Sequence, residues 1–269
     1  MLAEHQVILG NVAFHRITEA DTCRHISESL ARGQGGFMVT ANLDHLLRCN
    51  RHPEYLALVR KADLVVADGM PLIWASRIQG TPLPERVAGS TLCLSLAKAI
   101  SQSGRSIFLL GGNPGVAERA ANVLAQRFPG LVVAGTYCPP FGFETNPNEI
   151  DRIQSMIRDA KPDVVYVALG SPKQEELIDR FRGEFSATWW MGIGISLSFI
   201  TGEVRRAPKW VQNLGLEWAH RLIQEPKRLA RRYLIEGIPF AFWLFASSAM
   251  KRLPGFFRPR DCRGVCRRD

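Results

Sequence analysis

The stretch DVVYVALGSPKQEELIDR, residues 163–180, decides the fold. Residues 164–169 form an unbroken, valine-rich apolar run, which is typical of a strand buried on both faces of a parallel sheet. Ser171, Pro172 and Gln174 then follow with the spacing of an N-cap, a first helical residue and the third residue of a capping box. The stretch therefore predicts a strand, a tight turn and a helix.

The predicted turn is a candidate ligand site. Open α/β sheets bind ligands at the carboxyl ends of their strands, and the free N–H groups of a helix N-terminus attract phosphate. Gly170, Ser171, Lys173 and Gln174 lie at such a position, so we expect them to contact a ligand. The alternative is a well-capped crossover helix that binds nothing.

The same succession of apolar run, turn and helix recurs along the chain. Further strand-like runs occupy residues 37–40, 63–68, 106–112, 131–137 and 187–193. At least five such units in series predict an α/β, Rossmann-like fold with a mostly parallel, doubly wound sheet. Before them, residues 6–17 predict a hairpin or bent ribbon around Gly10 and Asn11.

Polar residues follow several of the predicted strands. Asp68 comes directly after a buried strand and before a glycine, which is a common place for a general base or a ribose-binding group. The alternative is an aspartate that stabilises the turn. Thr40 and Asn42 end another strand, where they either face a ligand or cap the next helix.

Two loops carry further candidates. Arg86 lies between proline and glycine residues, where an arginine is either solvated or clamps a phosphate. Gly111 and Gly112 open a turn that lets the backbone approach a phosphate or sugar closely. No Gly-Lys-Ser/Thr follows, so this is not a Walker motif, and the glycines at 192 and 194 lack the third glycine of a dinucleotide fingerprint.

The charge is unevenly distributed. The whole chain has a net charge of +9, but residues 204–269 contain 15 Lys and Arg against 5 Asp and Glu. Such asymmetry indicates a polyanionic partner, namely anionic lipid headgroups, a diphosphate or nucleic acid. We therefore expect an α/β catalytic core at 1–203, a helical basic appendage at 204–250 and a disordered basic tail at 251–269.

The appendage also has an apolar segment. Residues 205–234 form an arginine-rich helical pattern with interleaved aromatic residues, which suits a membrane interface or is simply a solvated face. The 13 uncharged residues 238–250 are fewer than the ~20 that span a bilayer, so they predict an interfacial anchor or a core helix. As an anchor, the segment would insert its aromatic side chains into the cytoplasmic leaflet: Phe240, Phe242, Trp243 and Phe245.

The remaining composition points to a protein of the cytosol. The six cysteines form no CxxC pair, and the first four are predicted to be reduced thiols. Cys262 and Cys266 have no histidine nearby and make a poor zinc site. The N-terminus lacks the pattern of a signal peptide, and no Asp-x-Asp motif or metal-ligand spacing occurs, so we expect neither secretion, a bound metal nor a cofactor.

Six motifs, taken in order, carry a resemblance to a known family. They are VTANLDHL from residue 39, VVADGMPLIWASR from 65, ERVAGS from 85, FLLGGNPGVAERAA from 108, DVVYVALGSPKQE from 163 and RRAPKWVQNLGLEWAHRLIQEPKRLARRY from 205. The chain resembles the WecB/TagA/CpsF glycosyltransferases of bacterial surface-polysaccharide synthesis. The resemblance implies inverting transfer of a sugar from a UDP-sugar to a polyprenyl-diphosphate-linked acceptor, by a peripheral protein on the cytoplasmic face of the membrane.

The resemblance also implies roles for particular residues. Asp68 matches the family's proposed catalytic base, and Thr40 and Asn42 match positions near the reacting sugar, with Thr40 counted among the catalytic residues. Arg86 and Gln174 match further pocket positions. The appendage arginines thought to grip the acceptor's diphosphate correspond to Arg221, Arg228 and Arg231. Ser198 stands where many members have an aspartate implicated in nucleotide contact, so the resemblance leaves open how the nucleoside is held and which donor is used.

Two other function classes remain alternatives. A nucleotide-dependent oxidoreductase has the same fold, and titration with a fluorescent reduced nicotinamide would detect it. A nucleic-acid-binding protein would also explain the basic tail, and vesicle flotation against a DNA gel shift at matched salt separates the two polyanions. The sequence leaves the donor sugar and the oligomeric state open, a homo-oligomer included.

Overall fold

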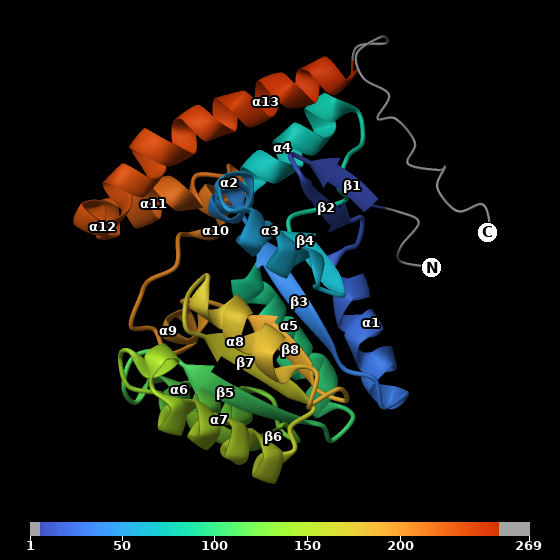
Figure 1. The fold of residues 1–269 in the computed structure, drawn as a ribbon, viewed down its shortest axis with the longest axis vertical. Helices are drawn as coiled ribbons and strands as arrows, with labels where there is room; N and C mark the ends of the chain where they lie inside the picture. The colour runs from blue at the N-terminus through green and yellow to red at the C-terminus, as the bar shows by residue number, and fades with distance from the viewer. Residues whose placement is uncertain (1–5, 253–269) are drawn as a thin grey trace, which may run out of the picture.

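A six-stranded parallel sheet forms the centre of the structure, a computed structural model that describes residues 6–252 (Figure 1). Its strand order is β4-β3-β8-β7-β5-β6. The strands are β3 (Gly36–Ala41), β4 (Leu64–Ala67), β5 (Ser106–Gly111), β6 (Val132–Tyr137), β7 (Val164–Ala168) and β8 (Trp189–Gly192). All five neighbouring pairs are parallel, which confirms the predicted α/β, Rossmann-like sheet.

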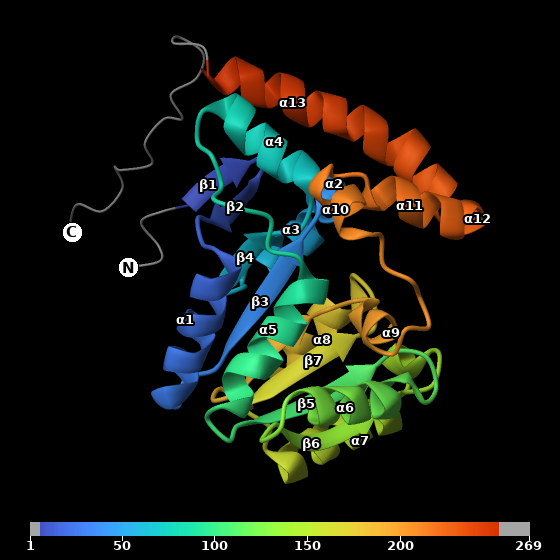
Figure 2. The same ribbon diagram turned by 180° about the vertical axis from the view of Figure 1, so that it is seen from behind.

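Helices cover both faces of this sheet. One face packs against α1 (Glu19–Ala31), α5 (Gly89–Ser101), α6 (Val116–Arg127) and α9 (Ser196–Ile200), which lie in front of the sheet in Figure 2. The other packs against α2 (Leu43–Arg51), α3 (Pro53–Arg60), α7 (Pro147–Ala160), which follows the short helix η1 (Phe143–Thr145), and α8 (Lys173–Phe181). On β7, Val165 and Val167 face one core and Tyr166 faces the other, so this strand is buried on both sides as its sequence predicts.

The predicted hairpin forms β1 (Gln6–Leu9) and β2 (Val12–His15), which pair antiparallel as a separate small sheet. It adds apolar side chains to the same core as α2 and α3.

The start of α8 differs from the prediction. The helix begins at Lys173 with Pro172 at the N-cap position and without a side-chain cap. The Ser171 hydroxyl instead lies 2.8 Å from the Tyr55 hydroxyl, so its hydrogen-bonding capacity is used across the fold rather than on its own helix. The capping-box interpretation of Ser171 and Gln174 is therefore wrong, although the strand, turn and helix are where the sequence places them.

The registers of the strands align their carboxyl ends. Ala41 of β3 pairs with Ala67 of β4, and Gly192 of β8 pairs with Val39 on one side and Val167 on the other. Residues that follow these strands in the chain therefore meet along one edge of the sheet, where α/β folds bind ligands.

The appendage lies across this edge (Figures 1 and 2). It begins with α10 (Lys209–Asn213) and α11 (Glu217–Gln224). A continuous 27-residue helix, Pro226–Arg252, then joins α12 (Pro226–Ala230), the π-helical segment η2 (Arg231–Gly237) and α13 (Ile238–Arg252). By length and apolar composition it is the one helix among the described residues that is able to cross a membrane.

One side of α13 is packed against the core. It runs alongside α4 (Met70–Gln79), with Phe240 and Leu244 buried in the same apolar core as the hairpin. Phe242 and Trp243 remain exposed, at 70% and 46%. The prediction that Phe240 inserts into a membrane is therefore wrong, because its side chain is buried within the protein.

The predicted boundary of the tail also shifts. Lys251 and Arg252 are the last residues of α13, since the helix that starts in the appendage does not stop at residue 250. The rest of the predicted disordered tail, with Cys262 and Cys266, lies outside the described residues.

The packing of α13 on α4 can be measured through Leu244, which is fully buried. Leu244→Ala should lower the free energy of unfolding by about 2–5 kcal/mol, because it removes buried methyl groups and leaves a cavity. Urea unfolding measures this loss. The exposed Phe242, half a turn away, provides the control, since Phe242→Ala should change stability by no more than about 0.5 kcal/mol. Equal effects of the two substitutions would show that α13 is not docked on the core.

Candidate active site

A cavity of about 1680 Å³ lies between the carboxyl edge of the sheet and the appendage. Small-molecule sites usually occupy about 300–1,000 Å³, so this one has room for two substrates. Of the predicted site residues, all but Gly111 and Arg231 line it: Thr40, Asn42, Asp68, Arg86, Gly112, Gly170, Ser171, Lys173, Gln174, Ser198, Arg221 and Arg228.

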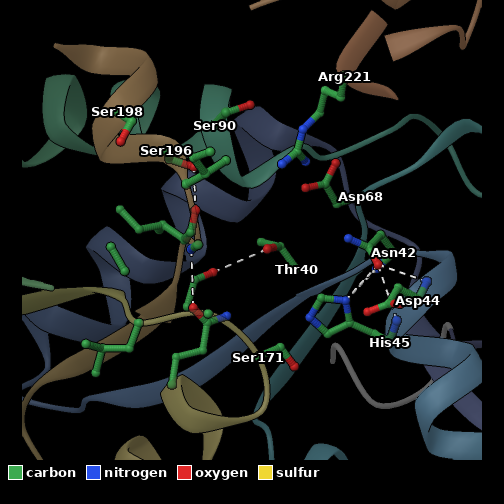
Figure 3. A pocket seen from close by; sticks show the side chains of 18 of the residues that line it. Thr40, Asn42, Asp44, His45, Asp68, Ser90, Ser171, Ser196, Ser198 and Arg221 are labelled. Carbon is green, nitrogen blue, oxygen red and sulfur yellow. Dashed lines mark hydrogen bonds between the residues drawn. The ribbon is translucent and has the colours of Figure 1, made fainter. Parts of the chain in front are cut away.

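Asp68 follows β4 and faces this cavity (Figure 3). Its Oδ2 accepts a hydrogen bond of 3.1 Å from the backbone N–H of Gly89, the first residue of α5. Burial raises the pKa of Asp68, while Arg86 and the Gly89 N–H lower it in part. The aspartate thus stabilises a helix start and also presents a carboxylate of increased basicity to the cavity.

Arg86 is not free to bind a phosphate in this structure. Its guanidinium donates to Glu217 of α11 at 2.9 Å, and Arg206 contacts the other oxygen of the same carboxylate at 3.2 Å. The Arg86–Glu217 pair joins a loop of the core to the appendage beside Asp68, and the Arg206–Glu217 pair lies within the appendage.

Thr40 and Asn42 are held by hydrogen bonds at the end of β3 (Figure 3). The Thr40 hydroxyl donates to the carbonyl of Gly192 at 3.3 Å. Asn42 is the N-cap of α2, and its Oδ1 accepts from the backbone N–H groups of Asp44 and His45. Asn42 therefore caps the next helix as predicted, and its side chain also lines the cavity.

A network of buried polar side chains holds together the loops that follow β3, β7 and β8, next to the cavity. The Gln174 amide donates to Glu175 at 2.7 Å, and its carbonyl oxygen accepts from the Gly194 N–H at 3.2 Å. His45 lies 3.8 Å from the same oxygen of Glu175, and its other ring nitrogen lies 2.8 Å from Asn42 Oδ1. The network links the ends of β3, β7 and β8.

The Glu175 carboxylate is the charged centre of this network and is 1% exposed. Burial by itself raises the pKa of Glu175, but contacts with His45, Gln174 and Ser171 outweigh burial, so that this pKa lies below its usual range. A charge at this depth needs partners, and Gln174 and His45 both contact Oε1, while Oε2 has no hydrogen-bond partner among the described residues.

The remaining loop residues have different surroundings. Lys173 forms an ion pair with Glu144 and lies over the ring of Phe141, 5.1 Å from its centroid. Gly112 lines the cavity, whereas Gly111 packs below it, where a Cβ would approach the Ala168 carbonyl oxygen to 2.6 Å. The close approach at Gly111 is therefore to the neighbouring strand rather than to a ligand.

The appendage arginines differ in whether they line the cavity and in which groups they contact. Arg221 points toward Asp68 in Figure 3, and its buried Nε has no hydrogen-bond partner among the described residues. Arg228 lines the cavity and pairs with Glu225 at 2.5 Å. Arg231 is 84% exposed, faces Glu236 and lies outside the cavity, while Arg232, one helical turn after Arg228, lines it and binds both oxygens of Asp44.

Comparison with known proteins identifies the family. A model described as "Glycosyl transferase WecG/TagA/CpsF family" matches residues 7–254. The chain belongs to this family of glycosyltransferases. It is 33% identical to the N-acetylglucosaminyldiphosphoundecaprenol N-acetyl-beta-D-mannosaminyltransferase of Bacillus spizizenii, over 75% of this chain and 76% of that protein. It is also 33% identical to the protein of the same name from Staphylococcus aureus strain MW2, over 80% and 81%. These matches confirm the family that the six motifs indicated.

Three residues of this glycosyltransferase site escaped the sequence reasoning. His45 and Glu175 lie next to predicted site residues within two of the six motifs, which is a signal that was available. Arg232 was not singled out, because the spacing of arginines does not reveal which face of a π-helical segment meets the cavity. Across residues 6–252, no three His, Cys, Asp or Glu side chains are grouped so as to hold a metal ion.

The buried network of the glycosyltransferase can be tested by Glu175→Gln. At pH 7 this change should cost about 1–3 kcal/mol of unfolding free energy, because His45 loses its charged partner. The exposed neighbour Glu176 gives the matched control, since Glu176→Gln removes the same charge outside the network and should cost less than about 0.5 kcal/mol.

The pH dependence of this stability difference has a defined sign. The folded-state pKa of Glu175 lies below its unfolded value of about 4.3. The carboxylate's contribution is therefore fully present above about pH 4.3 and is lost as the pH falls through the lower folded-state pKa. Urea unfolding from pH 3 to pH 7 should show the gap between the wild type and Glu175→Gln widening with pH. A gap that stays constant would contradict a charged Glu175.

Proposed function

We propose that this glycosyltransferase transfers an N-acetylhexosaminyl residue from a UDP-sugar to a saccharide on a polyprenyl diphosphate, with inversion, in the synthesis of a bacterial surface polysaccharide. The observation that carries the proposal is the pair of relatives whose name specifies N-acetylmannosaminyl transfer to a diphosphoundecaprenol-linked sugar. The large cavity, with a carboxylate on its core side and arginines on its appendage side, supports it.

In this proposal Asp68 is the general base. The acceptor hydroxyl attacks the anomeric carbon of the donor from the face opposite UDP and gives its proton to the Asp68 carboxylate. The bond from the anomeric carbon to the UDP oxygen breaks, and the electron pair leaves with the diphosphate. Because burial raises the pKa of Asp68, the carboxylate is a stronger base than an exposed aspartate.

The departing diphosphate needs positive charge around it. Cationic side chains that line the cavity meet this requirement, and among them Arg221 has a buried Nε that is unpartnered among the described residues. Lys173 and the turn after β5, residues 112–115, line the same cavity. Thr40, Asn42 and Gln174 are fixed by hydrogen bonds and would orient the donor sugar. Ser198 supports a neutral contact to the nucleoside, since it lines the cavity without a charge.

We further propose that the protein is peripheral on the cytoplasmic face of the membrane. The exposed side of the Pro226–Arg252 helix carries large apolar side chains, among them Ile235, Phe242 and Trp243. Lys227, Arg228 and Arg231 are exposed on the same helix, and each cation near an anionic leaflet contributes about 1 kcal/mol. Cations and apolar side chains together favour a helix that lies in the interface.

A donor screen tests the proposed function. UDP-N-acetylmannosamine, UDP-N-acetylglucosamine and UDP-glucose would each be incubated with a synthetic N-acetylglucosamine-diphospholipid, and UDP release measured. At least one N-acetylhexosamine donor should release UDP only when the acceptor is present. Parallel reactions in EDTA test the prediction that no metal is needed. Absence of acceptor-dependent release with every donor, in EDTA and in Mg²⁺ alike, would contradict the proposal.

Replacing Asp68 tests the general base. Asp68→Asn should lower kcat by about 10²–10⁴-fold while leaving the Kd of the UDP-sugar unchanged, because only proton transfer is lost. In the wild type, kcat/KM should fall toward low pH with a midpoint above the ordinary aspartate pKa of about 3.9, since protonation removes the base.

Two neighbours should move that midpoint in opposite directions. Arg86 lowers the pKa of Asp68 and Glu217 raises it, so Arg86→Gln should shift the midpoint to higher pH and Glu217→Gln to lower pH. The pH profiles of kcat/KM measure both shifts. If both variants move it the same way, or neither does, the group that titrates is not Asp68.

A further inference from the structure

The cavity continues beyond the arginines into a groove walled by three helices. Leu43 and Leu47 of α2, and Met70 and Trp74 of α4, lie four residues apart on their helices and line it as pairs. The third wall is the face of α13 that carries Ile238, Ala241, Phe242 and Phe245, at the spacing of one helical stripe. These eight side chains, here called the apolar groove, are continuous with the polar site.

Along the Pro226–Arg252 helix, the side chains that line the cavity change from charged to apolar. Arg228 and Arg232, one turn apart, line the cavity first, and the apolar residues from Ile238 onward follow them. Glu236 is the one charged residue between positions 233 and 250, and it faces Arg51 and Arg231 instead of the groove. A ligand that fits this order has an anionic head joined to an apolar tail.

The groove is not filled by the protein itself. Ile238 is 37% exposed and Phe242 is 70% exposed, although both line the cavity, so large apolar surfaces face solvent. Removing such surface from water is favourable, and this favours an apolar occupant. From Ile238 to Phe245 the helix rises by roughly 10 Å, at 1.5 Å per residue, which limits contact to the first part of a long chain.

We propose that the apolar groove binds the first isoprenoid units of the acceptor lipid. The diphosphate then lies at Arg228 and Arg232, where guanidinium groups suit phosphate oxygens, and the attached saccharide extends toward Asp68. This inference rests on the proposed function and specifies how the same cavity selects its acceptor. Glu225 and Asp44, which pair with these arginines in the free protein, hold them at the junction between the polar site and the groove.

A series of acceptors with graded tails tests the groove without a membrane. N-acetylglucosamine diphosphate esters of ethanol, geraniol and farnesol would be assayed below their micelle-forming concentrations and without vesicles. In the wild type, KM should fall at least 10-fold from the ethyl to the farnesyl acceptor, with little change in kcat. Phe242→Gln and Ile238→Gln should lose most of this gain and keep the KM of the ethyl acceptor.

Two further variants distinguish binding in the groove from nonspecific binding to exposed apolar side chains. Ile235 is 70% exposed, as Phe242 is, and lies on the same continuous helix outside the cavity, so Ile235→Gln is the matched control and should retain the tail-length gain. Ala241→Trp should abolish the gain by filling the groove while adding apolar surface. Equal KM values for the three tails in the wild type, or an Ile235→Gln loss as large as that of Phe242→Gln, would overturn the proposal.

Failure of the proposed function can be distinguished from failure of the groove proposal. If no acceptor is glycosylated, the function fails, and calorimetry with farnesyl diphosphate against ethyl diphosphate decides the groove separately. Tighter binding of farnesyl diphosphate, lost in Ala241→Trp, supports the groove, and equal Kd values overturn it.

Discussion

The site depends on the ion pairs that Glu217 makes with Arg86 of the core and with Arg206 of the appendage, because the first of these pairs holds the appendage over the carboxyl edge of the sheet. All three side chains are mostly buried, so the contacts are screened less than surface pairs. Removing one partner of a fully buried pair costs about 3–5 kcal/mol, and less where, as here, some exposure remains. The same ion pairs place cations and a carboxylate around Asp68, so appendage docking and the basicity of Asp68 are coupled.

At its C-terminal end, the appendage is held to the core by apolar packing. There α13 packs on α4 through the buried apolar side chains of Phe240 and Leu244. Between the two ends, Arg232 binds Asp44 at the start of α2. The appendage is thus held by ion pairs beside Asp68 and by apolar packing at α13. Between these contacts, the polar and apolar parts of the cavity stay open next to each other. A single closely packed interface would fill this space.

Much of the core was predictable because its signals are local. The valine-rich run of β7 and the position of Asp68 after β4 follow from the order of residues, and strand register then brings distant residues to one edge. The capping role of Ser171 was mispredicted because Tyr55, 116 residues away, provides another hydrogen-bond partner. Phe240 was misplaced for a related reason: a helical pattern shows which residues share a face but not which face meets the core. Arg231, which was assigned by the resemblance, lies outside the cavity, and its role in acceptor binding stays a prediction. His45 and Glu175 carry no local signal of burial, since charged residues of the same types lie exposed nearby.

The pairing of the appendage arginines bears on how an acceptor binds. Arg228 and Arg232 each contact a carboxylate, so a diphosphate must compete with Glu225 and Asp44 for them. Arg228 has more than half of its side chain exposed, and a salt bridge in such surroundings is worth only about 0–1 kcal/mol, so exchanging Glu225 for a phosphate oxygen costs little. Binding of an anion to the Arg221 Nε replaces no carboxylate, because this atom has no hydrogen-bond partner among the described residues. An anion therefore gains most from contact with Arg221, whose Nε has no partner to give up in the described part of the chain, and less at the arginines beside the groove, from which a product must leave.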